Sequence, residues 1–202
     1  YFGGQGRVSS GNLLEDGHFY TTFEVATAAG INANVAFELA YYSQLPDEVE
    51  DFEAIEVVAA EGGAWFVSLF GKTPKVSKAL KEQRMAATKW RKDVQKFLHS
   101  LAGTDAKERQ ECLKKMLMDK NLNPKLEIWE KGLIIHALGD AFSHSRNANR
   151  INKTKILYSS PFGHYHDDQV PDTIALNKPQ YNEYTNNLFE ALGGQNNNNS
   201  QQ

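Results

Sequence analysis

The segment 124–144 constrains the fold most, because it combines an apolar helical pattern with ionisable side chains at one repeated spacing. Its hydrophobic residues recur at intervals of three and four, as on a helix with apolar faces. His136, Asp140 and His144 are each four residues apart, so they lie on one slowly drifting stripe of that helix. A fold built around this helix must bury a carboxylate between two imidazoles.

Burial of such a carboxylate is unfavourable unless another group neutralises its charge. A divalent cation held by imidazole and carboxylate ligands would do so, and helical spacing suits such ligands. Gly139 thins the helix beside Asp140, which would let another helix or a ligand approach closely. The alternative is a helix whose polar core residues pair with one another or with water.

Similar patterns predict helices elsewhere, over 17–29, 32–44, 47–60, 77–101, 105–118 and 179–192. Residues 64–70 fit a helix or a strand, and 146–177 have no regular pattern. We therefore expect an all-α fold, a single helical-bundle domain of about seven helices with a long irregular segment before the last one. The expected boundaries are a flexible lead-in at 1–14, the helical domain at 15–192 and a disordered tail at 193–202.

Composition excludes several classes of function. The 202 residues carry a net charge of -3, which does not indicate an extended nucleic-acid surface. No apolar run reaches the roughly 20 residues of a membrane-spanning helix. Cys112 is the single cysteine, so neither an internal disulfide nor a multi-cysteine zinc site is available. Because the chain begins at Tyr1 instead of methionine, we expect a fragment or a processed product.

A second cluster of candidate ligands lies at 163–172. If this segment is helical, His164 and Asp168 share a face; if it is extended, His164, His166 and Asp168 do. A solvated polar loop is the alternative.

Two further elements precede the central helix. His18 lies early in the first predicted helix among apolar neighbours, and an acidic turn with Asp47 and Asp51 follows the second. Each has a plainer interpretation, a structural histidine and a solvated helix start. His99 has only basic and apolar sequence neighbours, so we leave it out of the site. The basic segment 75–96 fits a solvated face better than a surface for phosphate headgroups or RNA.

The ordered set resembles the zinc-dependent phospholipase C and single-strand nuclease superfamily, an all-helical fold with a clustered metal site. His136-x3-Asp140 matches the His-x3-Asp pair of that family, in which the aspartate bridges metals, and His144 stands for the next histidine. His164-x3-Asp168 is similar to its final His-x3-Glu pair, with aspartate replacing glutamate. The family also has a histidine between the acidic turn and the central helix, where only His99 is available.

The start of the chain and its later blocks also resemble a group of uncharacterised bacterial proteins related to that superfamily. The shared features are the His18-Phe19 step that opens the first helix, the turn at 44–47, and the Gly-His and Pro-Asp pairs at 163–164 and 171–172. The resemblance covers residues 15–60 and 125–192.

The resemblance implies a zinc-dependent phosphodiester hydrolase with about one to three zinc ions, or other divalent metals. Asp140 would bridge two metals, with His136 and His144 on different ones. Asp47 or Asp51 would be the general base, and Asp51 and Asp172 are reserve ligands or groups that orient a histidine. The implied metal ligands are His18, Asp47, His136, Asp140, His144, His164 and Asp168.

Three functions remain open at this stage. A phospholipase C-like enzyme is favoured, because the net charge is negative and we find no alternation of aromatic and basic residues that marks a nucleic-acid groove. A single-strand nuclease would use the same metal site, and a non-catalytic interaction domain would hold a structural metal or a polar core. The glycine-rich lead-in would suit a toxin module at the C-terminal end of a larger secreted protein, which would have an inhibitory partner protein.

Overall fold

The computed structural model describes residues 16–48, 89–90, 92–147, 154–159, 174 and 176–195. Within these residues the fold is all-α, as predicted, except for one antiparallel sheet of two short strands. The predicted lead-in, most of the helix expected at 47–60, and the segment 64–70 lie outside the described residues.

The elements follow one another in this order: η1 (Asp16–Tyr20), α1 (Thr21–Ala28), α2 (Ala33–Glu48), η2 (Val94–Leu98), α5 (Ala106–Met118), η3 (Asn123–Lys125), α6 (Ile128–Ser143), β1 (Ser145–Asn147), β2 (Lys155–Leu157) and α7 (Lys178–Ala191). Elements η1 and η2 are single π-turns, and η3 is a 3-10 turn.

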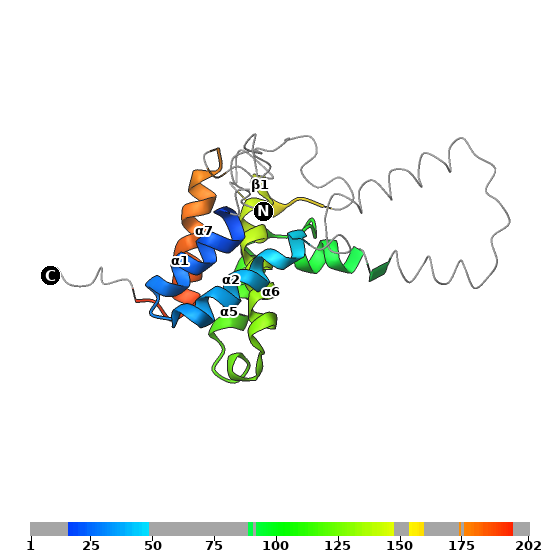
Figure 1. The fold of residues 1–202 in the computed structure, drawn as a ribbon. Helices are drawn as coiled ribbons and strands as arrows, with labels where there is room; N and C mark the ends of the chain where they lie inside the picture. The colour runs from blue at the N-terminus through cyan, green and yellow to red at the C-terminus, as the bar shows by residue number, and fades with distance from the viewer. Residues whose placement is uncertain are drawn as a thin grey trace, which may run out of the picture.

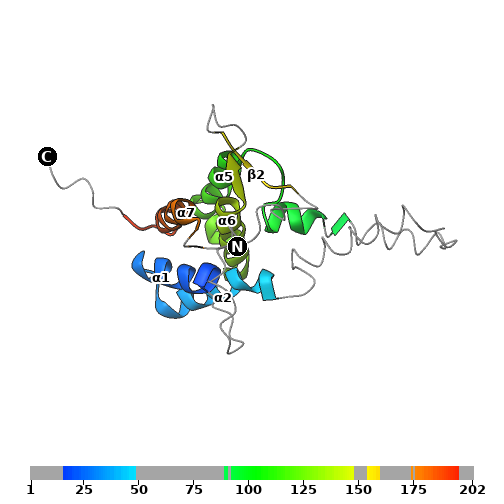
Figure 2. The ribbon, with the colours of Figure 1, turned by 90° about the horizontal axis from the view of Figure 1, so that it is seen from above.

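Helix α6 lies at the centre of the bundle, with α2, α5 and α7 around it (Figure 1). Seen from above, α1 and α2 lie on one side of α6 and α5 on the other, with α7 beside α6 (Figure 2). Residues 135–143 of α6 are buried without interruption. The helix begins at Ile128 instead of the predicted residue 124, because Glu127 and Glu130 form a capping box there. The predicted central helix is thus confirmed, but it begins about one turn later than expected.

Helices α2 and α6 approach each other almost backbone to backbone. A Cβ atom added at Gly132 would overlap Tyr42 Cβ and lie 3.0 Å from the Tyr42 carbonyl carbon. Helix α2 also continues through Pro46 to Glu48, whereas the sequence predicted a helix over 32–44, which ends before Pro46. Proline has a helical φ, but it lacks the N–H that would bond to the carbonyl four residues earlier and its ring crowds that carbonyl, so Pro46 lies in the last turn against the usual preference.

Local signals mark the ends of the other helices. Asp105 caps α5 by accepting a hydrogen bond from the Glu108 backbone N–H at 2.9 Å. Gly30 and Gly193 follow α1 and α7 with φ of +88° and +91°, a conformation that favours glycine. Helices α5 and α7 therefore match their predicted ranges within one residue.

The hydrophobic core surrounds the buried length of α6. The sheet, which pairs Ser145 with Leu157 and Asn147 with Lys155, was not predicted, because strands of three residues are too short to show alternation. Leu157 nevertheless reaches the core. The larger core side chains are Leu39, Leu113, Leu117, Ile135, Leu138, Phe142, Leu157, Tyr184 and Leu188.

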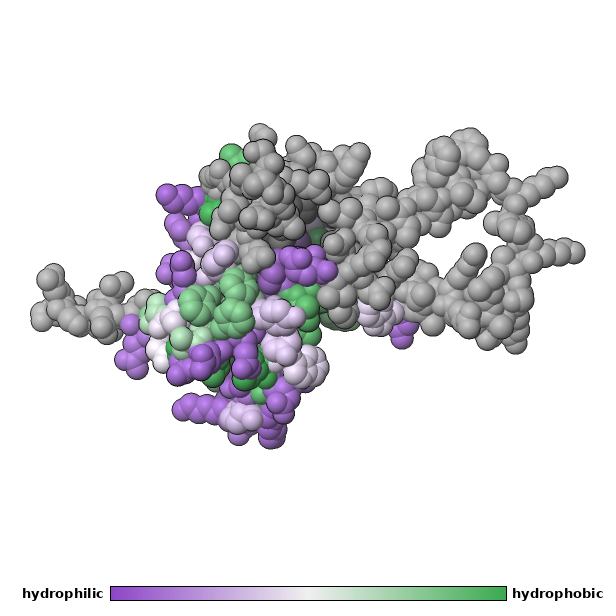
Figure 3. Space-filling model, viewed as in Figure 1, coloured by the Kyte–Doolittle hydropathy of each residue, from purple (hydrophilic) through white to green (hydrophobic). Residues whose placement is uncertain are grey.

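On the face shown in Figure 3, a hydrophobic patch over the region of α1 and α2 is bordered by hydrophilic side chains. Exposed aromatic residues of η1 and α2 include Tyr20, Phe37 and Tyr41. In the described part of the chain, no helix has both the length and the apolar character to cross a bilayer.

Candidate metal centre

Helix α6 presents His136 and Asp140 to one side, and both side chains are fully buried. The Asp140 carboxylate lies between imidazoles from different elements. Its Oδ2 is 3.4 Å from His136 Nε2, and its Oδ1 is 3.3 Å from Nε2 of His18, which comes from η1. Two stretches of chain 122 residues apart therefore meet at this carboxylate, as the sequence predicted.

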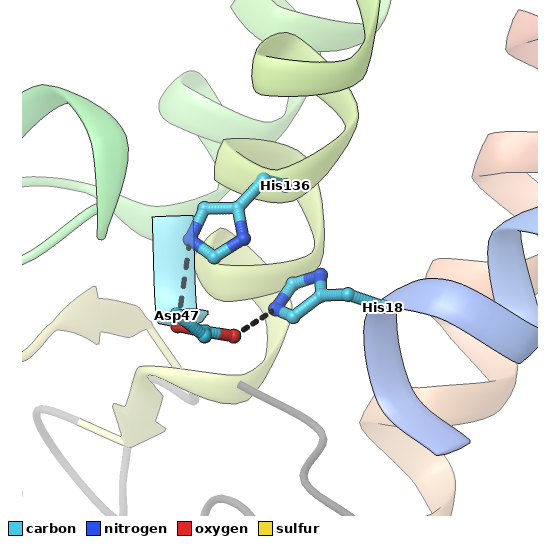
Figure 4. Close-up of side chains that lie close together, drawn as sticks. All are labelled: His18, Asp47 and His136. Carbon is cyan, nitrogen blue, oxygen red and sulfur yellow. Dashed lines mark ion pairs between the residues drawn. The ribbon is translucent and has the colours of Figure 1, made fainter. Parts of the chain in front are cut away.

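Asp47, in the last turn of α2, approaches the same two imidazoles (Figure 4). Its Oδ2 lies 3.8 Å from His18 Nε2, and its Oδ1 lies 4.0 Å from His136 Nε2. The two imidazole rings stack with their centroids 4.2 Å apart. The Asp47 side chain is 15% exposed, whereas those of His18, His136 and Asp140 are inaccessible, so Asp47 marks the outer side of the cluster.

His99 belongs to the cluster, so its exclusion on sequence grounds was wrong. Its Nδ1 lies 3.1 Å from Asp140 Oδ2 and 3.3 Å from His136 Nε2, and the residue is buried. The π-turn η2 ends at Leu98, and Ser100 adopts a positive φ of 51°, so the chain turns sharply around His99. Its polar neighbours come from α6, which the adjacent sequence could not reveal.

His144 lies at the end of α6, beside the same carboxylate. Its Nδ1 is 2.9 Å from the His99 carbonyl oxygen and 3.7 Å from Asp140 Oδ2. The other predicted residues of the site, Asp51, His164, Asp168 and Asp172, lie outside the described residues. Their contribution stays a prediction.

The donor atoms are spaced as ligands of one ion would be. Among the residues that the structure describes, two groups of three donors are each compact enough for a metal: His18 with Asp47 and His136, and His99 with His136 and Asp140. In the second group the three separations are 3.1, 3.3 and 3.4 Å. Tetrahedral zinc with ligands at about 2.05 Å requires donors roughly 3.3 Å apart. The residues therefore fit a zinc ion in size and chemistry.

Electrostatics also favour a cation here. Burial, together with the charge of His136, lowers the pKa of His18 to about 3, so its imidazole is neutral and able to bind a metal. Burial raises the pKa of Asp47 to about 6. Burial lowers the pKa of His136, but the Asp140 and Asp47 carboxylates outweigh it and raise that pKa overall. Without a metal, a proton on His136 is thus the cation that these carboxylates attract.

The Asp140 carboxyl group stays ionised despite its burial. Burial alone would raise its pKa, yet the nearby His144 and His136 imidazoles help to hold that pKa well below its usual range. Asp47 Oδ2 is buried and has no hydrogen-bond partner among the residues described, so it retains lone pairs for a cation. The cluster therefore keeps an anionic carboxylate at its centre.

Gly139 explains how η1 comes so close to α6. A Cβ atom at this position would lie 2.9 Å from His18 Cε1 and 3.3 Å from Tyr184 Cζ. The close approach expected at Gly139 is confirmed, and the approaching group is the His18 imidazole itself.

Comparison of the chain with protein-family models, with curated proteins and with solved structures finds no match. The case for a function therefore depends on the geometry of this cluster and on the residue pattern of the sequence.

Proposed function

We propose that this chain is a metal-dependent phosphodiester hydrolase with zinc as its first candidate metal. The observation that carries the proposal is the meeting of donors from η1, α6 and His99 around Asp140, at separations that suit zinc. Asp47 of α2 lies beside the His18 and His136 imidazoles of this group. The order of these residues, with His99 before the His-x3-Asp pair, is also the order in the phospholipase C and nuclease superfamily that the sequence resembles.

Each candidate ligand has a place in this proposal. His99, His136 and Asp140 would hold one ion, and His18 with Asp47 would complete a neighbouring position. Asp140 is suited to bridge them, because its two oxygens face different imidazoles. The resemblance adds His144, His164 and Asp168 as ligands of a further ion.

A divalent cation at this site would lower the pKa of a coordinated water and polarise a phosphoryl oxygen. The protein supplies the proton acceptor. Asp47 is the most accessible carboxylate of the cluster, and its pKa in the metal-free protein is about 6. It would serve as the general base if it stays off the ion, and as a ligand with His18 if it binds the ion. Asp140 stays charged, and His18 stays neutral, near neutral pH.

Phospholipid is our first candidate for the substrate. The net charge of -3 disfavours a long polyanion, and residues 16–48 contain no lysine or arginine. Next to His18, Phe19 packs edge-on against Phe37, with ring centroids 5.5 Å apart, and Tyr20 is half-exposed. An apolar surface beside the site suits acyl chains.

One observation favours a single-strand nuclease as the second candidate. Trp90 and Phe97 are 45% and 52% exposed, and they alternate with Lys89, Lys92 and Lys96, which are also exposed. Aromatic rings alternating with cations can stack on bases and contact phosphates. This surface immediately precedes His99, in contrast to the expectation that aromatic and basic residues do not alternate in this chain.

The test begins with metal analysis of the purified chain and continues with two activity assays, headgroup release from phosphatidylcholine vesicles and digestion of single-stranded DNA. We expect bound zinc and one activity that a chelator abolishes. Asp140→Asn should lose the metal and the activity while it keeps its helical circular dichroism. Glu190→Gln, which removes a surface carboxylate paired with Lys114, is the matched control and should retain both.

Full activity in Asp140→Asn would refute the two-metal arrangement. Bound metal without either activity would instead support the non-catalytic interaction domain with a structural metal. The toxin role, secretion as part of a larger protein and the inhibitory partner are further proposals, and a loss of viability in cells that express the chain, reversed by Asp140→Asn, would support the first.

A further inference from the structure

Ser43 of α2 contacts both histidines that face the Asp47 carboxylate. Its carbonyl oxygen lies 2.8 Å from His136 Nδ1. Its buried hydroxyl lies 3.1 Å from the carbonyl oxygen of His18. The same hydroxyl lies 3.1 Å from Thr22 Oγ1 and 2.9 Å from the Ala40 carbonyl oxygen. Its single proton is therefore shared between the His18 and Ala40 carbonyls, and its oxygen can accept from the Thr22 hydroxyl. One residue thus reaches an imidazole of α6 and the backbone of η1.

A backbone carbonyl dictates which nitrogen of an imidazole carries the proton. Because a carbonyl oxygen can only accept, the nitrogen at 2.8 Å must donate, and in a neutral imidazole the other nitrogen is then the lone pair. For His136 that lone pair is Nε2, the atom that faces Asp140 and Asp47. The His99 carbonyl does the same for His144, whose Nδ1 lies 2.9 Å away.

The packing of α2 on α6 explains why Ser43 is in range. Tyr42 lies against Gly132, one helical turn before His136, where the two backbones approach closely. Ser43 is the next residue along α2, so its carbonyl is brought to the imidazole. A bulkier residue at position 132 would move this carbonyl away.

We propose that Ser43 is a positioning residue for the metal centre, setting the tautomer of His136 through its carbonyl and fixing the backbone of His18 through its hydroxyl. This inference rests on the proposed metal function. Backbone and side-chain groups that orient a ligand in this way commonly change metal affinity by about 10–100-fold when they are lost.

The first test is the tautomer itself, in the metal-free, unsubstituted protein. Two-bond ¹⁵N–¹H correlation spectra of ¹⁵N-histidine protein are recorded at a pH high enough to leave His136 neutral. We expect the Nδ1–H pattern for His136 and for His144. An Nε2–H pattern at His136 would overturn the proposal, whether or not the protein binds metal.

The second test is Ser43→Ala, which removes the hydroxyl and keeps the carbonyl. We expect the His136 tautomer to persist, while zinc affinity, measured by competition with a chelating dye on the folded protein, falls about 10-fold. Thr185→Ala removes a hydroxyl that makes an exposed hydrogen bond to the Asn182 carbonyl of α7, and it should leave zinc affinity unchanged.

The possible outcomes separate the two proposals. Unchanged zinc affinity in Ser43→Ala, with only a lower melting temperature, would show a merely structural role and overturn the positioning role of the hydroxyl. If the unsubstituted chain binds no zinc but shows the Nδ1–H tautomer at His136, the metal function fails while the control of the tautomer by the carbonyl stands.

Discussion

Gly139→Ala tests whether the close approach of η1 to α6 is required for metal binding. The added Cβ would lie 2.9 Å from His18 Cε1, 3.3 Å from His18 Nδ1 and 3.3 Å from Tyr184 Cζ. Favourable carbon–carbon contacts lie at about 3.5–4.0 Å, so the His18 ring must retreat by roughly 0.6–1 Å. Retreat along this direction changes the 3.3 Å separation of His18 Nε2 from Asp140 Oδ1.

The expected loss of stability is small. Overpacking costs about 1–3 kcal/mol, and replacing a helical glycine by alanine returns about 1 kcal/mol. The free energy of unfolding of the metal-free protein should therefore fall by about 0–2 kcal/mol. Metal affinity should fall by at least about 10-fold, because ligand positions are tolerated only within about 0.2 Å.

The assay compares zinc titration with urea denaturation of the same variant. Gly30→Ala is the control, since nothing lies within 4 Å of its Cβ position and its φ of +88° makes alanine unfavourable by about 1–2 kcal/mol. It should lose stability but keep zinc affinity. The reasoning is refuted if Gly139→Ala binds zinc as well as the unsubstituted protein, or if both variants lose affinity equally.

Three further changes have defined outcomes. Gly132→Ala forces a Cβ into the Tyr42 backbone and should lower the free energy of unfolding by about 3 kcal/mol, measured by urea denaturation; a loss below about 1 kcal/mol would contradict the helix contact. Ser100→Ala keeps the positive φ but loses the hydrogen bond to the Ala137 carbonyl, so the free energy of unfolding should fall by about 1–2 kcal/mol. Ser100→Gly loses the same hydrogen bond, but glycine favours a positive φ, so this variant should be nearly neutral. Equal losses of stability in the two variants would contradict this explanation. Burial raises the pKa of Asp47 to about 6 in the folded protein. Its ionised carboxylate therefore destabilises the metal-free fold above that pH. This effect is absent below about pH 4, where the carboxyl group is mostly protonated in both the folded and the unfolded state. Asp47→Asn should therefore stabilise the chelator-treated protein by about 1–3 kcal/mol at pH 7.5 and not at pH 3.5, as thermal unfolding at both values would show.

Much of the fold followed from local signals in the sequence. The apolar periodicity of α6, the Asp105 cap and the glycines after α1 and α7 each act within a few residues, so their effects could be predicted. The predicted end of α2 and the predicted start of α6 were less accurate, because α2 continues through Pro46 and Glu127 caps a later start of α6. The short sheet depends on pairing between separate segments and left no pattern.

The residues of the candidate site also divide into those that a local sequence pattern reveals and those that only the fold brings together. His136 and Asp140 share a stripe of one helix, and that stripe could be identified from their spacing. His99 was excluded because its sequence neighbours are basic and apolar, while its spatial partners are contributed by α6. Its order relative to the His-x3-Asp pair was the single signal in its favour. Ser43 acts partly through a backbone carbonyl, which no side-chain pattern can reveal.

The most direct test of the metal centre is anomalous diffraction from crystals of the chain soaked in zinc, recorded on both sides of the zinc absorption edge. We expect a strong peak about 2.0–2.2 Å from His99 Nδ1, His136 Nε2 and a carboxylate oxygen of Asp140. A fully soaked crystal without any anomalous peak within about 3 Å of that carboxylate would contradict the account, because no metal would then occupy the cluster.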